Sequence, residues 1–259
     1  MHLASAPYRP PSIGERARDA IRSEGILRFA RHTMRWLAQY AAGVPGSVLG
    51  RSDTFAVGGT SYEYLVHRYH YTWLNERAVE VPIVRGVLAG VGNGRVLEVG
   101  NVLGHYGSVS HAVIDRYERA PGVINADVLE FEDEAGFELI VSISTLEHVG
   151  WDERPRDHSA AERAFARLAQ LLSPGGNLVV TVPVGYNPHL DQAIRAGRLG
   201  LSQLRALRRE QRRNIWYEVD PAEVWDAPYD WLLCTAHGIA VCHAHRPAVD
   251  SALGTSGGD

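Results

Sequence analysis

The chain has 259 residues and a formal net charge of -4, and all 26 of its basic residues are arginine, because it contains no lysine. This composition excludes a Schiff-base lysine, a Gly-Lys-Ser/Thr phosphate loop and the Tyr-x-x-x-Lys pair of short-chain dehydrogenases. The charge gives no overall attraction to nucleic acid, so we do not expect nucleic acid as a partner, although arginines concentrate over residues 16–35 and 205–213. The length fits one α/β domain with an N-terminal extension.

The sequence also bears on the compartment. No apolar stretch approaches the roughly 18 residues that span a bilayer, and the N-terminus lacks the apolar core of a secretory signal. The two cysteines, Cys234 and Cys242, have no second cluster that would complete a metal-thiolate site. We therefore expect reduced thiols and a cytoplasmic protein.

The N-terminal extension is predicted to span residues 1–71. Residues 13–40 have apolar side chains at helical spacing, with arginines available for the other side. Such an amphipathic helix packs on the main domain, on a partner such as a second copy, or on a membrane surface; the sequence leaves these alternatives open. The pair Gly58-Gly59 predicts a β-hairpin between 54–57 and 61–66. We expect the extension to be a lid or a partner contact.

A catalytic domain is expected over residues 72–247, followed by a disordered tail over 248–259. A helix should begin at Trp73 and be broken or kinked by Pro82. A further arginine-rich stretch, 190–213, is interpreted as helical. Apolar runs predict strands near 95–100, 112–115, 123–125, 138–143, 178–184, 214–218 and 238–243. Their alternation with helices predicts a mostly parallel sheet, in which the short first crossover holds little more than a turn.

The most informative stretch is 95–107, Arg-Val-Leu-Glu-Val-Gly-Asn-Val-Leu-Gly-His-Tyr-Gly. Its first half is a buried strand, and its glycines allow the backbone to approach a ligand closely. Asp115 ends the second strand, where a carboxylate can accept hydrogen bonds from the two hydroxyls of a ribose. The spacing of Gly100, Gly104 and Gly107 does not match Gly-x-Gly-x-x-Gly, which weakens an interpretation as an NAD site.

Taken together, these segments resemble the class I S-adenosylmethionine-dependent methyltransferases over roughly residues 72–245. The motifs that carry the resemblance are Val96-Leu97-Glu98-Val99-Gly100, Asp115, Asp127, Ser144-Thr145-Leu146-Glu147-His148-Val149 and Leu172-Ser173-Pro174-Gly175-Gly176. The resemblance implies a Rossmann-like α/β fold with a seven-stranded sheet in the order 3-2-1-4-5-7-6 and an antiparallel final hairpin. The chain departs from the family at Val102, where a glycine is usual. We therefore expect a cofactor loop with its own conformation, or alternatively a protein that has lost the activity.

The resemblance implies that S-adenosyl-L-methionine is the cofactor and S-adenosyl-L-homocysteine its product. The turn at 100–104 would approach the methionine part, Asp115 the ribose and Asp127 the adenine. Arg77 would pair with the cofactor's carboxylate, unless it forms a helix-surface ion pair with Glu80 or Glu76. The predicted cofactor-binding residues are Glu98, Gly100, Asn101, Gly104, Asp115, Asp127, Ser144 and Arg77.

Methyl transfer from a sulfonium needs alignment and, for a hydroxyl acceptor, a base. His148 is the predicted base because imidazole titrates near neutrality. The lower-ranked candidates are His105, Tyr106 and His70. A divalent metal such as magnesium, held by the acidic segment 152–158, is a further alternative. An aromatic platform for a sugar ring would come from Trp151, Tyr229 and Trp231.

The segments 75–80, 97–106 and 144–153 look more specifically like sugar O-methyltransferases of the methylmannose polysaccharide type. The leading prediction is therefore methylation of a hydroxyl on a small saccharide or glycoside. A phenolic, polyketide or lipid-linked acceptor is the runner-up. A non-catalytic protein that only binds the cofactor is the alternative from another class.

Overall fold

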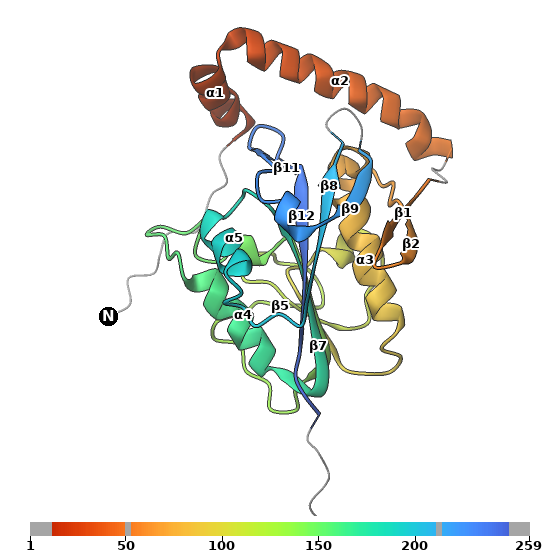
Figure 1. The fold of residues 1–259 in the computed structure, drawn as a ribbon, viewed down its shortest axis with the longest axis vertical. Coiled ribbons are helices and arrows are strands. Elements are labelled where there is room, and N and C mark those ends of the chain that lie inside the picture. The colour runs from red at the N-terminus through yellow and green to blue at the C-terminus, as the bar shows by residue number, and fades with distance from the viewer. Residues whose placement is uncertain (1–11, 50–52, 211–213, 249–259) are drawn as a thin grey trace, which may run out of the picture.

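The computed structural model describes residues 12–49, 53–210 and 214–248, so the predicted tail lies almost entirely outside the described residues. At the centre is an eight-stranded sheet in the order β5-β4-β3-β6-β7-β12-β8-β9. Its strands are β3 (Val96–Val99), β4 (Ala112–Ile114), β5 (Val123–Ile124), β6 (Phe137–Ile143), β7 (Leu172–Pro183), β8 (Gln203–Arg209), β9 (Trp216–Val219) and β12 (Gly238–His245). The helices α4 (Ala160–Gln170) and α5 (Pro188–Arg195) lie on one face and α3 (Arg77–Ala89) on the other (Figure 1).

The predicted mostly parallel α/β sheet is confirmed, but its strand number and order differ from the prediction. Strands β3 to β7 are mutually parallel, β12 is antiparallel to both β7 and β8, and β9 is antiparallel to β8. Numbered along the chain, the order is 3-2-1-4-5-8-6-7 rather than 3-2-1-4-5-7-6. The difference arises because β9 adds an eighth strand beyond β8, at the edge of the sheet.

The prediction of a helix over 190–213 is correct only for its first residues. Only Pro188–Arg195 is helical, and Gln203–Arg209 is strand β8. Leucine, alanine and arginine favour helices, which explains the prediction. In the folded chain, Ala206 and Leu207 are both fully buried and belong to the cores on opposite faces of the sheet. This alternation is that of a strand covered on both faces, so tertiary packing outweighs helix propensity here.

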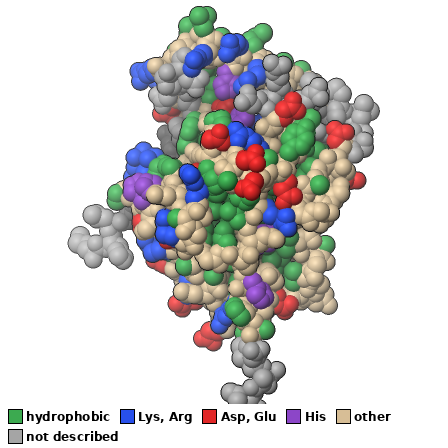
Figure 2. All heavy atoms as spheres, in the orientation of Figure 1, with side chains coloured by type: hydrophobic (Ala, Val, Ile, Leu, Met, Phe, Trp, Pro, Cys, Tyr) green, Lys and Arg blue, Asp and Glu red, His purple; other side chains and the backbone are tan. Residues whose placement is uncertain are grey.

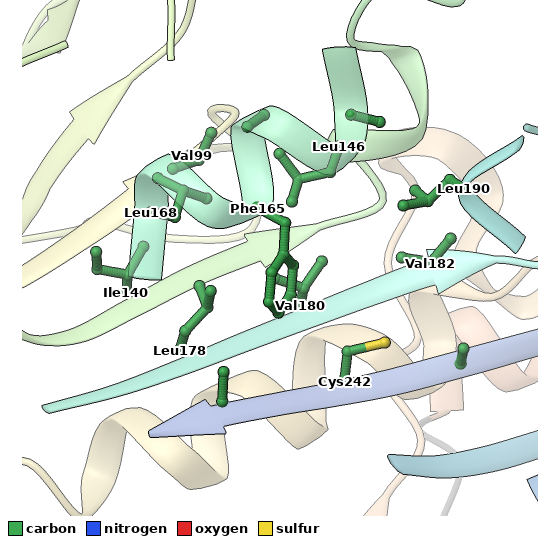
Figure 3. Packing of buried hydrophobic residues seen from close by; sticks show 14 of the residues in the cluster. Val99, Ile140, Leu146, Phe165, Leu168, Leu178, Val180, Val182, Leu190 and Cys242 are labelled. Carbon is green, nitrogen blue, oxygen red and sulfur yellow. The ribbon is translucent and has the colours of Figure 1, made fainter. Parts of the chain in front are cut away.

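Two apolar cores hold the sheet between its layers. On one face, Phe165 and Leu168 of α4 pack over Ile140, Leu178 and Val180 (Figure 3). On the other face, α3 packs over the alternate residues of the same strands. Burial on both faces explains why these strands are nearly continuous apolar runs in the sequence. It also fixes the carboxyl ends of β3, β4 and β6 relative to one another.

The N-terminal extension forms two helices rather than one. They are α1 (Ile13–Glu24) and α2 (Ile26–Leu49), and the chain turns between them at Gly25, whose φ is +84°. Tyr40 of α2 packs edge-on against Tyr71, 5.3 Å between ring centroids. The predicted hairpin is confirmed as β1 (Thr54–Val57) and β2 (Thr60–Glu63), joined by two glycines with positive φ.

The helix predicted to begin at Trp73 begins instead at Arg77, and Pro82 does not interrupt it. Residues Tyr69–Leu74 form a 3-10 turn, η1, separated from α3 by two residues. Pro82 has no N–H to donate to the carbonyl of Ala78. The backbone N–H of Leu65 donates to that carbonyl instead, at 2.9 Å. The freed acceptor is therefore satisfied, and α3 runs on to Ala89.

Candidate active site

A cavity of about 500 Å³ lies at the carboxyl ends of β3, β4 and β6. Ligand sites of α/β sheets lie at this edge, and pockets for small ligands have volumes of roughly 300–1,000 Å³. The polar residues that line the cavity are Asp115, Arg116, Tyr117, Glu118, Asp127, Ser144, Thr145, His148, Asp152 and Glu153. Gly100 also lines it. Five of the predicted site residues, Gly100, Asp115, Asp127, Ser144 and His148, are thus brought together, whereas Glu98, Asn101, Gly104 and Arg77 do not line the cavity.

Glu98 shapes the glycine turn from beneath. Its side chain is fully buried, and its Oε1 accepts the backbone N–H groups of Val102 and Leu103, at 2.9 and 2.7 Å. The other oxygen, Oε2, lies 2.8 Å from Nε2 of His111. A carboxylate that accepts backbone N–H groups can order a loop without touching a ligand. Val102 itself has a φ of -92°, so this loop does not need a glycine there.

The two glycines of the turn are required by their surroundings. Gly100 has a φ of +86°, and a Cβ at this position would collide with Oγ1 of Thr145. A Cβ at Gly104 would collide with Oδ1 of Asn101. Asn101 in turn donates from Nδ2 to Glu118 at 2.7 Å. Asn101 and Gly104 therefore hold the back of the turn, and the Gly100 backbone forms part of the cavity wall.

Asp115 follows β4 directly and has one oxygen available to a ligand. Its Oδ1 accepts the N–H groups of Tyr117 and Glu118, at 2.8 and 2.7 Å. Among the described residues, the one hydrogen-bond donor to its Oδ2 is the N–H of Asn101, at 3.3 Å. A carboxylate oxygen has two lone pairs, so Oδ2 can take a further hydrogen bond from a hydroxyl in the cavity. Glu118, which sequence reasoning missed, supplies a second carboxylate beside it.

The cavity wall is acidic. Five carboxylates line it, from Asp115, Glu118, Asp127, Asp152 and Glu153. Arg116 is the one arginine of the lining, and it bridges Asp127 and Glu153 at 3.0 and 2.7 Å. A concave site with carboxylates in excess favours a cationic ligand and disfavours a pyrophosphate. The sequence predicted Asp115 and Asp127 as cofactor residues and put Asp152 and Glu153 close to His148, but it gave no role to Glu118.

The side chain of Arg77 is hydrogen-bonded at the end of β6. Its Nη1 donates to Glu80 at 2.8 Å and to the carbonyl of Ile143 at 3.2 Å. Burial alone would lower the pKa of Arg77, but the neighbouring Glu80 and Glu76 carboxylates raise it above its usual value. The predicted ion pair with Glu80 is therefore present, buried rather than on a helix surface. Ser144, with a φ of +39°, donates its hydroxyl to the same Glu80 at 2.5 Å.

His148 lies on the cavity wall with a carboxylate behind it. Its Nδ1 is 2.6 Å from Oδ2 of Asp152, and the hydroxyl of Tyr186 donates to Asp152 at 2.8 Å. Burial alone would lower the pKa of His148, but Asp152 and the neighbouring Glu147 raise it above its usual value. In the tautomer in which Nδ1 donates to Asp152, Nε2 is the ring nitrogen left to take a proton; it lies 3.6 Å from Oε1 of the buried Glu147. Asp152 and Tyr186 were not predicted in this role.

The lower-ranked base candidates lie elsewhere. The residues His105, Tyr106 and His70 do not line the cavity. Nε2 of His105 is 3.1 Å from Glu118, and the buried hydroxyl of Tyr106 has no hydrogen-bond partner. His70 belongs to η1. His148 is therefore the candidate base with access to the cavity.

The predicted magnesium alternative finds no support. Among the described residues, no group of three or more His, Cys, Asp or Glu side chains could hold a metal ion. The acidic side chains of 152–158 are engaged by other partners. Glu153 binds Arg116 at 2.7 Å, and Asp157 binds Arg163 at 2.9 Å. These contacts turn the carboxylates toward arginines and away from a common centre.

Part of the predicted aromatic platform is assembled. Tyr229 and Trp231 pack together and against Tyr186, with ring centroids 4.9 to 5.0 Å apart. Tyr186 also contacts the ring of His148, 4.6 Å between centroids. Trp231 is 52% exposed and offers a free apolar face. Trp151 does not join this group, because it packs near His158 and His189 instead.

Comparison with known proteins finds distant similarity to solved structures. No protein-family model matches the chain, and no curated protein matches it. Among solved structures, the N-methyltransferase NodS from Bradyrhizobium japonicum WM9, bound to S-adenosyl-L-homocysteine, is 16% identical with a TM-score of 0.44, covering 66% of this chain and 87% of its own. The 1,6-didemethyltoxoflavin-N1-methyltransferase from Burkholderia thailandensis is 15% identical with a TM-score of 0.39, covering 76% and 100%. The sugar N-methyltransferase KedS8 from Streptoalloteichus sp. ATCC 53650 is 22% identical with a TM-score of 0.32, covering 51% and 60%. Similarities this distant assign the chain to no family and no activity.

Proposed function

We propose that this protein is an S-adenosylmethionine-dependent O-methyltransferase that acts on a hydroxyl of a small saccharide or glycoside. The observation that carries the proposal is the acidic cavity at the carboxyl ends of β3, β4 and β6, with His148 on its wall. The cofactor supplies an electrophilic methyl group on a sulfonium cation. Five carboxylates favour that cation, and the available oxygen of Asp115 suits a ribose hydroxyl.

In this proposal, the chain's own residues align the reactants and move one proton. The turn at 100–104 and Asp115 would hold the cofactor, with Asp127 toward the adenine. Arg77 lies behind the cavity, where it donates to the carbonyls of Ile143 and Ser144 at the end of β6. His148 accepts the proton of the acceptor hydroxyl at Nε2. Asp152 then stabilises the imidazolium through Nδ1, at 2.6 Å, and Tyr186 holds Asp152 in place. No metal ion is needed for these steps.

The saccharide acceptor is supported by the aromatic group of Tyr186, Tyr229 and Trp231. The C–H groups of a sugar ring pack against aromatic faces, and Trp231 is exposed beside the ring that contacts His148. The same faces suit the runner-up class, a phenolic, polyketide or lipid-linked acceptor. A non-catalytic cofactor-binding protein would use the cavity but not His148.

Incubation of the protein with methyl-labelled S-adenosylmethionine and a panel of glycosides and phenols separates these alternatives. We expect label on a glycoside hydroxyl, at a rate unchanged by added magnesium or by a chelator. Transfer to phenols alone would favour the runner-up acceptor. Cofactor binding without any transfer across the panel would favour the non-catalytic alternative.

We also propose that the N-terminal extension, residues 1–71, contacts a membrane surface through α2. Four apolar side chains there, Ile26, Leu27, Met34 and Leu37, are 48 to 84% exposed, and α2 contains arginines but no acidic residue. Figure 2 shows arginine and hydrophobic side chains side by side on this helical layer. Among the described residues, no helix is long and apolar enough to cross a membrane.

Vesicle sedimentation tests this membrane contact. We expect the protein to sediment with anionic vesicles and to lose this binding with salt or in Leu27→Glu, because surface binding combines apolar burial with charge attraction. Equal sedimentation of the wild type and Leu27→Glu would contradict the contact.

A further inference from the structure

A second, narrow cavity lies between α2 and the sheet, apart from the acidic cavity described above. Its lining includes His32 and Arg35 from α2 and, on the opposite side, Arg209, Asp230 and His237. Its volume is about 20 Å³, enough for one water-sized group. In contrast to the acidic cavity, its lining is rich in nitrogen.

Arg209 is buried there without a partner for its Nε atom. The residue is 8% exposed, and its Nε has no hydrogen-bond partner. Burial lowers the pKa of Arg209 to about 10, even though the Glu76 and Asp230 carboxylates nearby raise it. A buried charge without a partner is costly, so proteins usually pair it or use it to bind a ligand.

His237 adds a second buried nitrogen without a partner. Its Nδ1 is buried and has no hydrogen-bond partner. Burial, together with the charge of Arg209, lowers the pKa of His237 to about 4. The ring is therefore neutral near pH 7, and it can present an N–H donor without adding charge. Arg209 at the end of β8 and His237 just before β12 thus each present a nitrogen without a hydrogen-bond partner among the described residues, as does Nε2 of His32 from α2.

The negative groups near this cavity are already engaged. Oδ1 of Asp230 accepts the backbone N–H groups of Leu232 and Leu233 at 3.1 Å, and its Oδ2 lies 2.7 Å from Nε2 of His32 without hydrogen-bond geometry. Oε2 of Glu76 accepts the backbone N–H of Ala236 at 3.0 Å. Arg35 lines the cavity from α2 and faces Arg209, whose pKa its charge lowers. Among the described residues, neither carboxylate hydrogen-bonds to Nε of Arg209, which is therefore left for an outside acceptor.

We propose that Arg209, Arg35 and His237 form a binding site for an oxyanion, a phosphate or a carboxylate group. The small volume admits one oxygen edge of the anion to Arg209 Nε and His237 Nδ1, and the exposed Arg35 closes over the rest. Guanidinium groups bind both anions through charge-assisted hydrogen bonds. Strand β10 (Tyr229–Asp230) joins this cavity to the aromatic group beside His148. This inference rests on the proposed function: the site would bind an anionic group of the acceptor whose hydroxyl lies near His148.

Thermal unfolding in sodium phosphate, sodium acetate or sodium chloride at equal ionic strength tests the anion site without the methyl donor. We expect a saturable rise in the Tm of the wild type with phosphate or acetate beyond that with chloride, because a ligand that binds the folded state stabilises it. The salt that raises the Tm shows whether the site prefers a phosphate or a carboxylate. A wild type that responds to neither overturns the proposal.

Variants distinguish a specific site from general salt effects. Arg209→Met should weaken the anion response at least tenfold. The matched control is Arg208→Met, because Arg208 is exposed, pairs with Asp226 and points to the opposite side of β8. Arg35→Gln, at an exposed residue on the rim of the cavity, should also weaken the response without touching the core. Equal responses in the Arg209, Arg35 and Arg208 variants would overturn the site.

The stability of the variant without anion provides an independent readout. Replacing a buried guanidinium whose Nε has no hydrogen-bond partner by an apolar side chain of similar length should leave the Tm in chloride unchanged or raise it. If Arg209 were only structural, Arg209→Met would lower the Tm in chloride and phosphate alike. Because neither measurement involves methyl transfer, failure of the anion site is distinguishable from failure of the proposed function.

Discussion

Asp115→Asn should weaken the binding of S-adenosyl-L-homocysteine by about 10²-fold. The amide can keep its oxygen on the N–H groups of Tyr117 and Glu118. It then places an NH₂ group where Oδ2 now accepts from Asn101 and faces the cavity. Hydrogen bonds to a charged group contribute roughly 1.5–3 kcal/mol each, and about 1.4 kcal/mol is a factor of ten in affinity.

Calorimetric titration of this variant measures the effect directly. The matched control is Asp133→Asn, because Asp133 also accepts a backbone N–H, from Gly136 at 2.9 Å, and pairs with an arginine. Asp133 does not line the cavity. We expect the control to bind like the wild type. Wild-type affinity in Asp115→Asn would remove Asp115 from the cofactor site.

His148→Ala should lower kcat by about 10²-fold while leaving the affinity for S-adenosyl-L-homocysteine unchanged, since general-base catalysis contributes roughly 10²–10⁴-fold. The matched control is His158→Ala, a histidine that follows in the same part of the chain and stacks on His189. We expect the control to retain kcat. Equal kcat in the two variants would contradict the assignment of His148 as the base.

The pH dependence adds a second test of the same residue. The base must be neutral, so kcat should fall as the pH drops through the pKa of His148, which lies above its usual value. Asp152 is a main cause of that rise. Asp152→Asn should therefore move the acid limb of the profile to lower pH as well as lower kcat. An acid limb at the same pH in both proteins would contradict the role of Asp152.

The sequence predicted the part of the fold that local pattern determines. Strands buried on both faces were visible as apolar runs, and the Gly58-Gly59 hairpin was visible as a turn. Strand β8 was missed because its leucines, alanine and arginines favour a helix, and only its neighbours β12 and β9 make it a strand. The break predicted at Pro82 was wrong because of another contact outside the helix. The backbone N–H of Leu65 donates to the carbonyl of Ala78, which Pro82 leaves without a donor.

The candidate site shows the same division. Asp115 and His148 follow strands, so their position at the ligand-binding edge could be inferred from the strand order. Several side chains that hydrogen-bond to residues of the site come from parts of the chain far away in sequence. Tyr186 reaches Asp152 across 34 residues, and Glu80 reaches Ser144 across 64. Such contacts depend on packing that one sequence does not reveal, which also explains why Arg77 was placed on the cavity and found behind it.

The most direct test of the central claim is calorimetric titration of the wild-type protein with S-adenosyl-L-homocysteine, with NAD as the control. It tests the cavity without any knowledge of the acceptor. The acidic lining predicts saturable binding of S-adenosyl-L-homocysteine, in the micromolar range or tighter, and no binding of the pyrophosphate-bearing NAD. A well-folded protein that binds no S-adenosyl-L-homocysteine, or that binds NAD equally well, would contradict the assignment of this cavity to the methyl donor.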